Sequence, residues 1–212
     1  MPSRNQNGQK IGDKGKRTRA KLIDATIALL ETLGLRDVTV AEVAKVAGTS
    51  PATFYVYFDG VAEVVLAALE TAVQVTPETL SLLEEDFHGQ PGFKVACRFV
   101  EHYVEQWNKH RTAFRIRNLA AEEGDDRFLK ARQNAASPVM DILATKIARS
   151  RQAIPSPVQL EPRAIAGTIL IMLERLGAVG PLMKGDEQTS LPNLTLAAAH
   201  FLQFALVPAG SH

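Results

Sequence analysis

The strongest constraint on the fold of this chain is a pair of helix-start signals on either side of Gly48. Thr39 and Glu42 have the spacing of a capping box, in which a hydroxyl and a carboxylate satisfy the free N–H groups at a helix start. Ser50 can cap a second helix, with Pro51 at the first position, where the missing N–H costs nothing. Because Gly48 follows so soon, the first helix must be short. The pattern predicts two short helices joined as a helix-turn-helix.

The second of these helices, predicted to end near Tyr57, is unusually aromatic. Phe54 and Phe58 lie four residues apart, so they share one face and are expected to pack on the preceding helices. A different face of the helix carries Thr53, Val56 and Tyr57, and it is free to contact a partner outside the domain. Tyr55 lies between these two faces. The alternative is that all four rings simply pack in a core.

Helical patterning extends over nearly the whole chain, and strand-like alternation is scarce. A first helix is predicted in "RTRAKLIDATIALLETLG", and Gly34 suits the left-handed residue just past a helix end. Breaks such as "QPG", "GDD" and "IPSP" separate the later elements. The later helices are expected at 61–75, 77–87, 91–109, 111–122, 126–151, 159–183 and 191–206. We therefore predict an all-α fold.

Basic residues are concentrated at the N-terminus. Residues 1–21 contain seven basic residues and one acid, so they carry +6 in a chain whose net charge is only +1, and the remainder is mildly acidic. Such a basic arm either reaches a polyanion such as DNA or serves as a solubilising tail. Charge alone does not separate these alternatives.

Several features favour the cytoplasm and argue against a membrane. The single cysteine, Cys97, excludes an intrachain disulfide framework, which fits a reducing compartment. The N-terminus is polar and basic and lacks the apolar segment of a secretory signal. No apolar run approaches the roughly 18 residues that a membrane span needs. We expect a cytoplasmic protein.

The segment "DVTVAEVAKVAGTSPATFYVYFDGVAEVV" resembles the DNA-binding region of TetR-family transcriptional regulators. Order, spacing and residue type agree across three helices, from about Arg17 to Leu66. The resemblance implies a homodimer with one N-terminal three-helix DNA-binding unit per subunit. It also implies a larger C-terminal part that holds a small-molecule pocket and the dimer surface. Ligand binding would change the separation of the two DNA-binding units and release the operator.

Position by position, the resemblance places Pro51 to Val56 on the recognition helix and gives Tyr55 and Tyr57 phosphate contacts. Thr39, and Thr18 or Arg19, fall where helix N-termini meet the DNA backbone. Tyrosine hydroxyls can donate to phosphate oxygens, which fixes register without reading sequence. The predicted DNA-binding set is Lys14, Lys16, Arg17, Thr18, Arg19, Thr39, Thr49, Ser50, Pro51, Ala52, Thr53, Tyr55, Val56 and Tyr57.

Two features of this segment limit direct reading of bases. The stretch "SPATFYVY" lacks the Arg, Lys, Asn and Gln side chains that pair bidentately with bases. Thr53 and the apolar Ala52 and Val56 remain as readers, so DNA shape is expected to supply the rest. Family members usually have a polar, often lysine-bearing, start to the next helix, whereas this chain has Asp59. The basic arm is expected to compensate.

Apolar faces in the C-terminal part are candidates for an effector pocket. The face of 91–109 is rich in apolar and aromatic residues, for which core packing is the alternative reading. Polar residues beside such faces can orient a ligand. The predicted ligand-binding set is Cys97, Val100, Tyr103, Val104, Trp107, Phe114, Asn118, Met140, Met172 and Arg175.

The last two predicted helices are apolar over much of their circumference, so they must be buried on more than one side. They can pack both on the body and on a partner subunit, and a purely internal core is the alternative. The predicted dimer interface comprises Ile169, Leu173, Leu176, Leu196, Ala199 and Leu202.

The predicted organisation is a flexible basic arm (1–15), a helix-turn-helix domain (16–60), a ligand-binding and dimerisation domain (61–207) and a tail (208–212) that resembles a linker remnant. The expected function is a ligand-responsive regulator, a repressor, that binds a palindromic operator as a dimer and is released by a small, largely apolar molecule. The alternatives are a non-specific architectural DNA-binding protein and a helical enzyme. Phosphate-cradling, HExxH and Gly-x-Ser-x-Gly motifs are missing, so we expect no catalytic site, cofactor or metal.

Overall fold

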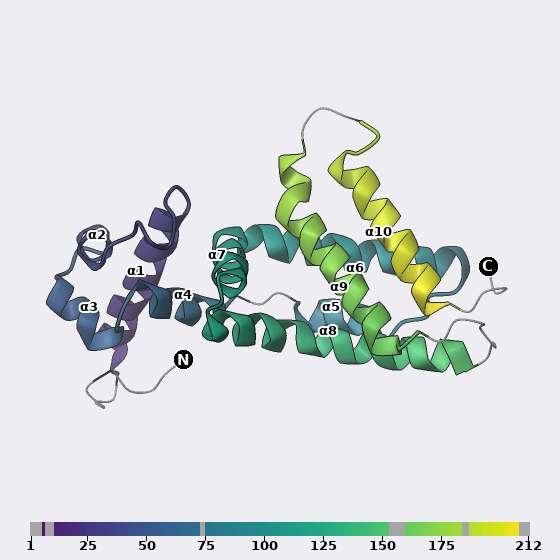
Figure 1. The fold of residues 1–212 in the computed structure, drawn as a ribbon, viewed down its shortest axis with the longest axis horizontal. Coiled ribbons are helices and arrows are strands. Elements are labelled where there is room, and N and C mark those ends of the chain that lie inside the picture. Colours follow the sequence, from purple (N-terminus) through teal and green to yellow (C-terminus); the bar gives the residue numbers. More distant parts are fainter. Residues whose placement is uncertain (1–5, 7–10, 73–74, 153–159, 184–186, 208–212) are drawn as a thin grey trace. The chain divides into compact units, whose positions relative to one another are not determined.

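The computed structural model describes residue 6 and residues 11–72, 75–152, 160–183 and 187–207. These residues form ten α-helices and one short 3-10 helix and contain no strand, so the predicted all-α fold is confirmed (Figure 1). The helices are α1 (Asp13–Leu30), α2 (Val40–Val46), α3 (Pro51–Tyr57), α4 (Val61–Leu69), α5 (Pro77–Leu82), α6 (Gly89–Lys109), α7 (Arg111–Glu122), α8 (Asp126–Gln152), α9 (Pro162–Val179), η1 (Gly180–Leu182) and α10 (Leu191–Leu206).

The chain divides into two compact units. The first contains residues 1–72 together with 112–132, and the second contains 73–111 together with 133–212. The first unit therefore includes nearly all of α7 and the beginning of α8, which lie far along the sequence. The proposed boundary between residues 60 and 61 divides domains by expected role, and it remains a prediction.

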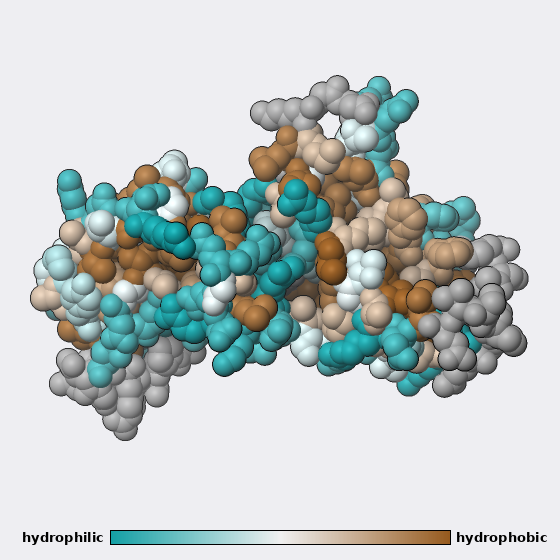
Figure 2. All heavy atoms as spheres, in the orientation of Figure 1, coloured by the Kyte–Doolittle hydropathy of each residue, from teal (hydrophilic) through white to brown (hydrophobic). Residues whose placement is uncertain are grey.

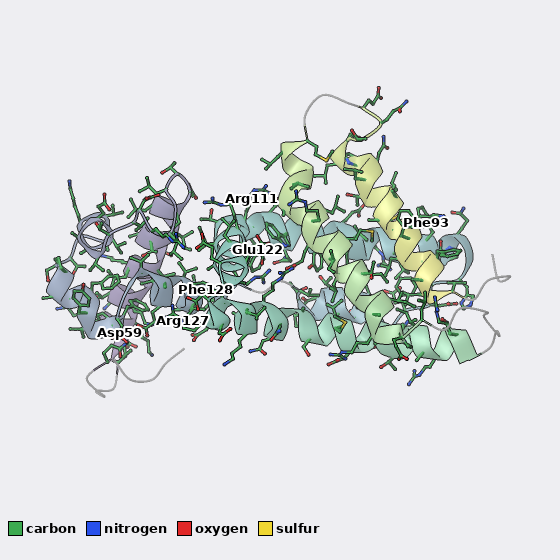
Figure 3. All side chains as sticks on the ribbon, in the orientation of Figure 1. Asp59, Phe93, Arg111, Glu122, Arg127 and Phe128 are labelled. Carbon is green, nitrogen blue, oxygen red and sulfur yellow. The ribbon has the colours of Figure 1, made fainter. Side chains whose placement is uncertain are left out.

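The core of the first unit draws on both of its segments. Phe54 and Phe58 of the helix-turn-helix region are buried with Val64 of α4. Ile116 of α7 and Phe128 of α8 belong to the same cluster, and Phe128 lies at the start of α8 (Figure 3). Because a buried phenylalanine contributes a large apolar area, the segment 112–132 is part of the fold of this unit.

Two arginine contacts connect these segments within the first unit. The last turn of α1 has no basic residue, and the Arg115 guanidinium donates a 2.6 Å hydrogen bond to the Leu30 carbonyl there. A cation at this position is favourable because helix C-termini carry partial negative charge. Arg36 also pairs with Glu123 at 3.0 Å, but both side chains are exposed, so this ion pair contributes little.

In the second unit, α6 packs against α9 and α10. The buried Gln203 of α10 donates 2.8 Å hydrogen bonds to the carbonyls of Phe87 and Gly89, which satisfies backbone groups of the connection before α6. Arg111 donates to the carbonyls of Gly177 and Ala178 at the end of α9. The Gln203 hydrogen bonds thus connect α10 to the start of α6. The Arg111 hydrogen bonds connect the end of α9 to the start of α7.

Helix boundaries differ from expectation where the sequence gives weak stop signals. α4 ends at Leu69 and α5 at Leu82, earlier than the expected 75 and 87, whereas 111–122 and 191–206 agree with the structure. The expectation for Gly34 is wrong, because α1 already ends at Leu30. Among described residues, the glycines with positive φ are Gly48, Gly89 and Gly124.

Apolar side chains also reach the surface in the second unit. Figure 2 shows apolar residues gathered over α9 and α10. The exposed large apolar residues of these two helices are Ile171, Leu196, Phe201 and Phe204. Within the described residues no single helix is long and apolar enough to cross a membrane, although the bent pair α3 and α4 together passes that composition test.

Candidate nucleic-acid interface

The start of α2 is held by the predicted capping box. The Thr39 hydroxyl donates a 2.7 Å hydrogen bond to the Glu42 carboxylate, and it accepts a 3.3 Å bond from the Glu42 N–H. The Thr39 N–H also donates to the same carboxylate at 3.0 Å. These two donors hold the pKa of Glu42 below its ordinary value. The capping box thus fixes where the first short helix begins.

The turn between the two short helices has the expected geometry. Gly48 adopts φ of 66°, a left-handed conformation that a residue without Cβ takes at little cost. The Thr49 N–H donates to the Ala44 carbonyl at 2.9 Å, which closes the end of α2. Ser50 then caps α3 by accepting a 3.2 Å bond from the Thr53 N–H. The predicted helix-turn-helix is present, with α3 spanning Pro51–Tyr57 as expected.

The two faces of α3 separate its aromatic residues. Phe54 and Phe58 are 0% and 1% exposed, which confirms the predicted inward face. Tyr55 is 54% exposed, although its ring edge contacts Phe54. The alternative that all four rings pack in a core is therefore wrong. The rest of the outer surface of α3 comprises the exposed Pro51 and Ala52 and the half-buried Thr53, Val56 and Tyr57.

Arg19 does not occupy the position expected of a DNA contact. It is only 6% exposed, and its guanidinium lies 5.0 Å from the centre of the Phe58 ring. This cation–π contact places Arg19 in the packing of the first unit. The expectation that its side chain is free to reach DNA is wrong, because the residue is buried with its guanidinium over the Phe58 ring.

Several hydroxyl groups of the predicted DNA-binding residues also form hydrogen bonds within the protein. The Thr18 hydroxyl donates to the Lys14 carbonyl at 3.1 Å. Both donors of Thr39 are directed to Glu42, so a phosphate at that position would compete with the capping box. The Ser50 and Thr53 hydroxyls lie 3.0 Å apart and form a hydrogen bond with each other.

Basic side chains are exposed at the beginning of α1. Lys14, Lys16 and Arg17 are exposed, and Lys16 forms a surface ion pair with Asp13 at 3.3 Å. Because α1 begins at Asp13, residues 13–15 of the expected flexible arm are helical. Residues 1–5 and 7–10 lie outside the described residues. Lys21 of α1 and Lys45 of α2 are exposed as well.

Tyr57 points toward the beginning of α1. A Cβ on Gly15 would lie 3.1 Å from the Tyr57 hydroxyl, so the tyrosine fills the space that this glycine leaves. The contact places the phenol oxygen beside Gly15, which lies between Lys14 and Lys16 in the sequence. A tyrosine hydroxyl so placed can donate to a phosphate oxygen while its ring supports the packing of α3.

The predicted effector-binding residues are distributed over both compact units. Val100, Tyr103, Val104 and Trp107 of α6 are buried in the second unit, and Cys97 is half-buried. Burial and the nearby Glu101 raise the pKa of the Cys97 thiol. Phe114 and Asn118 belong to the first unit, and Met140 lies on α8 in the second.

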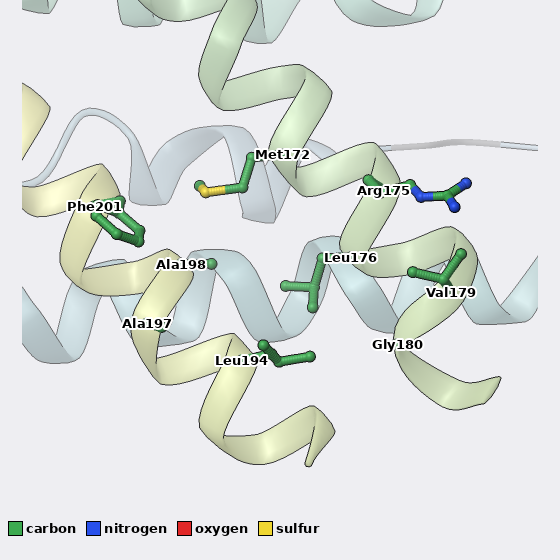
Figure 4. Close-up of a pocket in the computed structure, with 9 residues that line it drawn as sticks. All are labelled: Met172, Arg175, Leu176, Val179, Gly180, Leu194, Ala197, Ala198 and Phe201. Atoms are coloured by element: carbon green, nitrogen blue, oxygen red, sulfur yellow. The ribbon is translucent and has the colours of Figure 1, made fainter. Parts of the chain in front are cut away.

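Met172 and Arg175, the remaining two predicted effector-binding residues, line an apolar groove of about 320 Å³ between α9 and α10 (Figure 4). Phe201 and Leu194 border the groove from α10. Arg175 is the charged residue of the lining, and the other lining residues are Leu176, Val179, Gly180, Ala197 and Ala198.

Most of the predicted dimer interface lies inside the chain. Leu173, Ala199 and Leu202 are 0% exposed, and Ile169 and Leu176 are 6% and 8% exposed. These residues form the face by which α9 and α10 pack within the second unit, so they cannot form the expected external stripe. Of the six, Leu196 is exposed.

The described part of the chain holds no group of three or more His, Cys, Asp and Glu side chains placed to bind a metal ion. The interaction between His88 and Asp86 is a surface contact that lowers the pKa of the Asp86 carboxyl.

Two family profiles match the chain. Residues 22–68 match the profile described as bacterial regulatory proteins of the tetR family. Residues 80–192, more than half of the chain, match the profile described as the tetracyclin repressor-like C-terminal domain. No curated protein matches the sequence significantly.

Solved structures with the same fold cover nearly the whole chain. The fatty acid degradation regulator FadR from Bacillus halodurans is 17% identical, with a TM-score of 0.65 and coverage of 92% of this chain and 97% of that one. SmeT, the repressor of a Stenotrophomonas maltophilia multidrug efflux pump, is 15% identical, with a TM-score of 0.61 and coverage of 92% and 95%. A complex of SmeT with triclosan is 18% identical, with a TM-score of 0.61 and coverage of 92% and 94%. At these identities the likeness shows the shared fold.

Proposed function

The chain belongs to the TetR family of bacterial transcriptional regulators, and on this premise we propose that it represses transcription by binding a palindromic operator as a homodimer. We propose further that a small, largely apolar molecule releases it from the operator. The fold and both family matches indicate a regulator rather than an enzyme.

One observation carries the proposal of DNA binding: α3 presents Tyr55 outward while Phe54 and Phe58 anchor the helix from behind. The anchored helix keeps a fixed orientation, which a recognition helix needs in order to enter the major groove. Its outer surface is small and carries no charge. The exposed Lys14, Lys16 and Arg17 of α1 supply the positive charge that phosphate contacts require.

We propose a dimer because a single copy of α3 can discriminate only weakly between base sequences. Ala52, Thr53 and Val56 offer methyl groups and one hydroxyl, so one copy of the helix discriminates little between base sequences. Two copies related by a two-fold axis would square the weak preference of one helix for its half-site sequence. They would also require a palindromic site. Their half-sites would lie about 34–36 Å apart, or a multiple of that spacing.

The apolar outer surface of α9 and α10 supports a specific place for the dimer contact. Leu194, Ala197, Phe201 and Phe204 recur at helical spacing along α10, and each lies on the groove or is exposed. Phe201 and Phe204 are 59% and 61% exposed, which is unusual for phenylalanine in a protein that acts alone. We propose that this stripe, together with Met172 of α9, meets its symmetry mate.

The proposed effector is apolar because the predicted effector-binding residues of α6 are mainly apolar and aromatic. Triclosan, which is bound in the SmeT complex, is a small molecule on a protein of the same fold. We propose that the effector binds within the second unit beside α6. Thermal melting of the protein with a panel of small apolar compounds tests this point, because a ligand that binds only the folded state raises the melting temperature.

Selection of binding sites from random duplex DNA tests the proposed function. The expected result is enrichment of a palindrome whose half-sites have the spacing given above. Equal recovery of all sequences would favour the non-specific architectural alternative. A promoter fused to the selected site distinguishes repression from activation, since repression lowers its output until effector is added.

A further inference from the structure

The inward face of α1 begins with a residue that has no side chain. Arg19 and Leu22 are buried, and Gly15 precedes Arg19 by four residues, so it lies on the same face of the helix. A Cβ at position 15 would lie 2.9 Å from the Ile11 Cγ2 and 3.1 Å from the Tyr57 hydroxyl oxygen. Both distances are shorter than the roughly 3.5 Å at which carbon atoms pack without repulsion. The end of the Tyr57 ring therefore uses the space that Gly15 leaves.

The backbone does not account for a glycine at this position. Gly15 is the third residue of α1, and its φ is not positive. Because glycine weakens a helix relative to alanine, the helix by itself would favour a larger residue here. What the glycine provides is room for the Tyr57 ring.

The end of α3 is held in place beside this contact. Phe58 is buried, and the Arg19 guanidinium lies 5.0 Å from the centre of its ring. The Phe58 N–H donates to the carbonyl of the buried Phe54 at 3.0 Å. Since Tyr57 directly precedes Phe58, its backbone is fixed by these contacts. A side chain added at position 15 would therefore displace the Tyr57 ring and leave α3 where it is.

The Tyr57 hydroxyl is available to an acceptor outside the protein. The residue is half-buried, and its hydroxyl makes no hydrogen bond to another described residue. Lys14 and Lys16, which flank Gly15 in the sequence, are exposed. A tyrosine hydroxyl can donate to a phosphate oxygen, and such a contact sets the register of a protein on DNA without reading bases.

We propose that Gly15 is a positioning residue for operator binding, because it lets the Tyr57 hydroxyl donate to one DNA phosphate in each half-site. This inference rests on the proposed function. The packed ring holds the hydroxyl in place before DNA arrives, which reduces the conformational entropy that binding would otherwise cost. The position of a residue in α1 thus determines a contact made from the end of α3.

Tyrosine ring signals of the free protein test the first step without DNA. The chain has three tyrosines, Tyr55, Tyr57 and Tyr103, so ring-labelled tyrosine gives three sets of NMR signals, which Tyr→Phe variants assign. Gly15→Ala should shift the Tyr57 signals, leave those of Tyr55 unchanged and not lower the melting temperature. Gly12→Ala is the matched control, because a Cβ there meets no atom within 4 Å, and it should shift neither tyrosine.

Two results of this measurement would overturn the proposal. Tyr57 signals that stay in place in Gly15→Ala would show that the glycine does not position the ring. Signals of Tyr55 that move together with those of Tyr57 would show that α3 itself shifts.

Operator binding tests the second step. With the selected operator, Tyr57→Phe should weaken binding about fivefold for each half-site, the scale of one hydrogen bond. Gly15→Ala should weaken binding by about threefold or more, because a hydrogen bond weakens steeply as its geometry worsens, whereas Gly12→Ala should not. The double variant should bind no more weakly than Tyr57→Phe alone, since it has no hydroxyl to displace. Losses that multiply in the double variant would contradict a role through Tyr57.

Operator duplexes with a single neutral methylphosphonate linkage identify the phosphate. Wild-type protein should bind more weakly when one particular linkage of a half-site is neutral, and Tyr57→Phe should be less sensitive to that change. Gly15→Ala should lose sensitivity at the same linkage, and a loss at a different linkage would overturn the proposal. If the wild-type protein selects no operator, the proposed function fails, whereas the tyrosine signals still decide whether Gly15 positions Tyr57.

Discussion

Trp107 lies so close to Gly177 that a Cβ at position 177 would come within 2.5 Å of the indole Cγ. The contact joins α6 to α9 inside the second unit, where both residues are buried. The atoms that would be struck are the Cβ and the nearest ring atoms of Trp107, which cannot move without shifting α6. Close packing therefore requires a glycine at position 177. A positive φ is not the reason for this glycine, because Gly177 does not have one.

Gly177→Ala should therefore destabilise the protein by about 1–3 kcal/mol, the usual cost of overpacking a well-filled core. Gly167→Ala is the matched control on the same helix, because its Cβ would meet Met140 at an ordinary 3.7 Å. Alanine favours helix, so the control should be neutral or stabilising by up to about 1 kcal/mol. Urea unfolding of both variants measures the difference, and equal midpoints would contradict the packing argument.

The aromatic residues of α3 should separate stability from DNA binding. Phe54→Ala removes a side chain that is 0% exposed, so we expect a loss of ~3–5 kcal/mol in unfolding free energy. Tyr55→Phe removes one exposed hydroxyl and should leave the melting temperature nearly unchanged. It should weaken operator binding by roughly 1 kcal/mol, the scale of one hydrogen bond. An intact melting temperature in Phe54→Ala would show that the inward face is misassigned.

Local rules predicted the helix-turn-helix because every signal there is local. The spacing of Thr39 and Glu42, the glycine at 48 and the Ser50–Pro51 pair each act within one or two turns of helix. The interval of four residues between Phe54 and Phe58 likewise defined a face, since helical geometry relates them directly. The all-α fold followed from the same periodicity applied to the rest of the chain.

Contacts between residues far apart in the sequence could not be predicted from these local patterns. The Gln6 side-chain amide donates to the Glu63 carboxylate, 57 residues away, and no periodic pattern connects them. The guanidinium of Arg19 lies over Phe58, which follows α3 and is 39 residues away in the sequence. For α9 and α10, apolar residues occur all round, so the sequence left open which face packs inward. The structure puts Ala199 and Leu202 inside and Phe201 and Phe204 outside.

The capping box should make stability depend on pH. The Glu42 pKa is lowered in the folded state by the Thr39 donors, so its contribution is fully present above the ordinary pKa of a glutamate. That contribution is lost as the pH falls through the lowered pKa, because the folded state must then take up a proton at Glu42.

Glu42→Gln should therefore reduce the loss of stability on acidification, most visibly between about pH 5 and pH 3, the range around ordinary carboxylate pKa values. Glu31→Gln, which removes an exposed carboxylate from the same unit, is the control. Thr39→Ala should cost roughly 1 kcal/mol at neutral pH, as loss of an N-cap usually does. Melting temperatures measured across this pH range decide the matter, and parallel curves for wild type and Glu42→Gln would refute the linkage.

The outer face of α10 should control assembly, whereas its inner face should control folding. Phe201 is 59% exposed and Ala199 is 0% exposed, although they are only two positions apart in the sequence. Phe201→Asp should leave the melting temperature of the isolated subunit unchanged, convert the dimer to a monomer and abolish high-affinity operator binding. Ala199→Asp would bury an unpaired charge and should instead unfold the subunit.

Sedimentation and thermal melting of both variants, together with operator binding, distinguish these outcomes. Leu119→Asp, a change at an exposed leucine of α7 in the other unit, controls for adding a surface charge and should leave the dimer intact. If Phe201→Asp remains a dimer that binds the operator tightly, the interface does not include this face. If Ala199→Asp folds and sediments as a monomer, the inner face contributes to assembly in a way that its burial within the subunit does not explain.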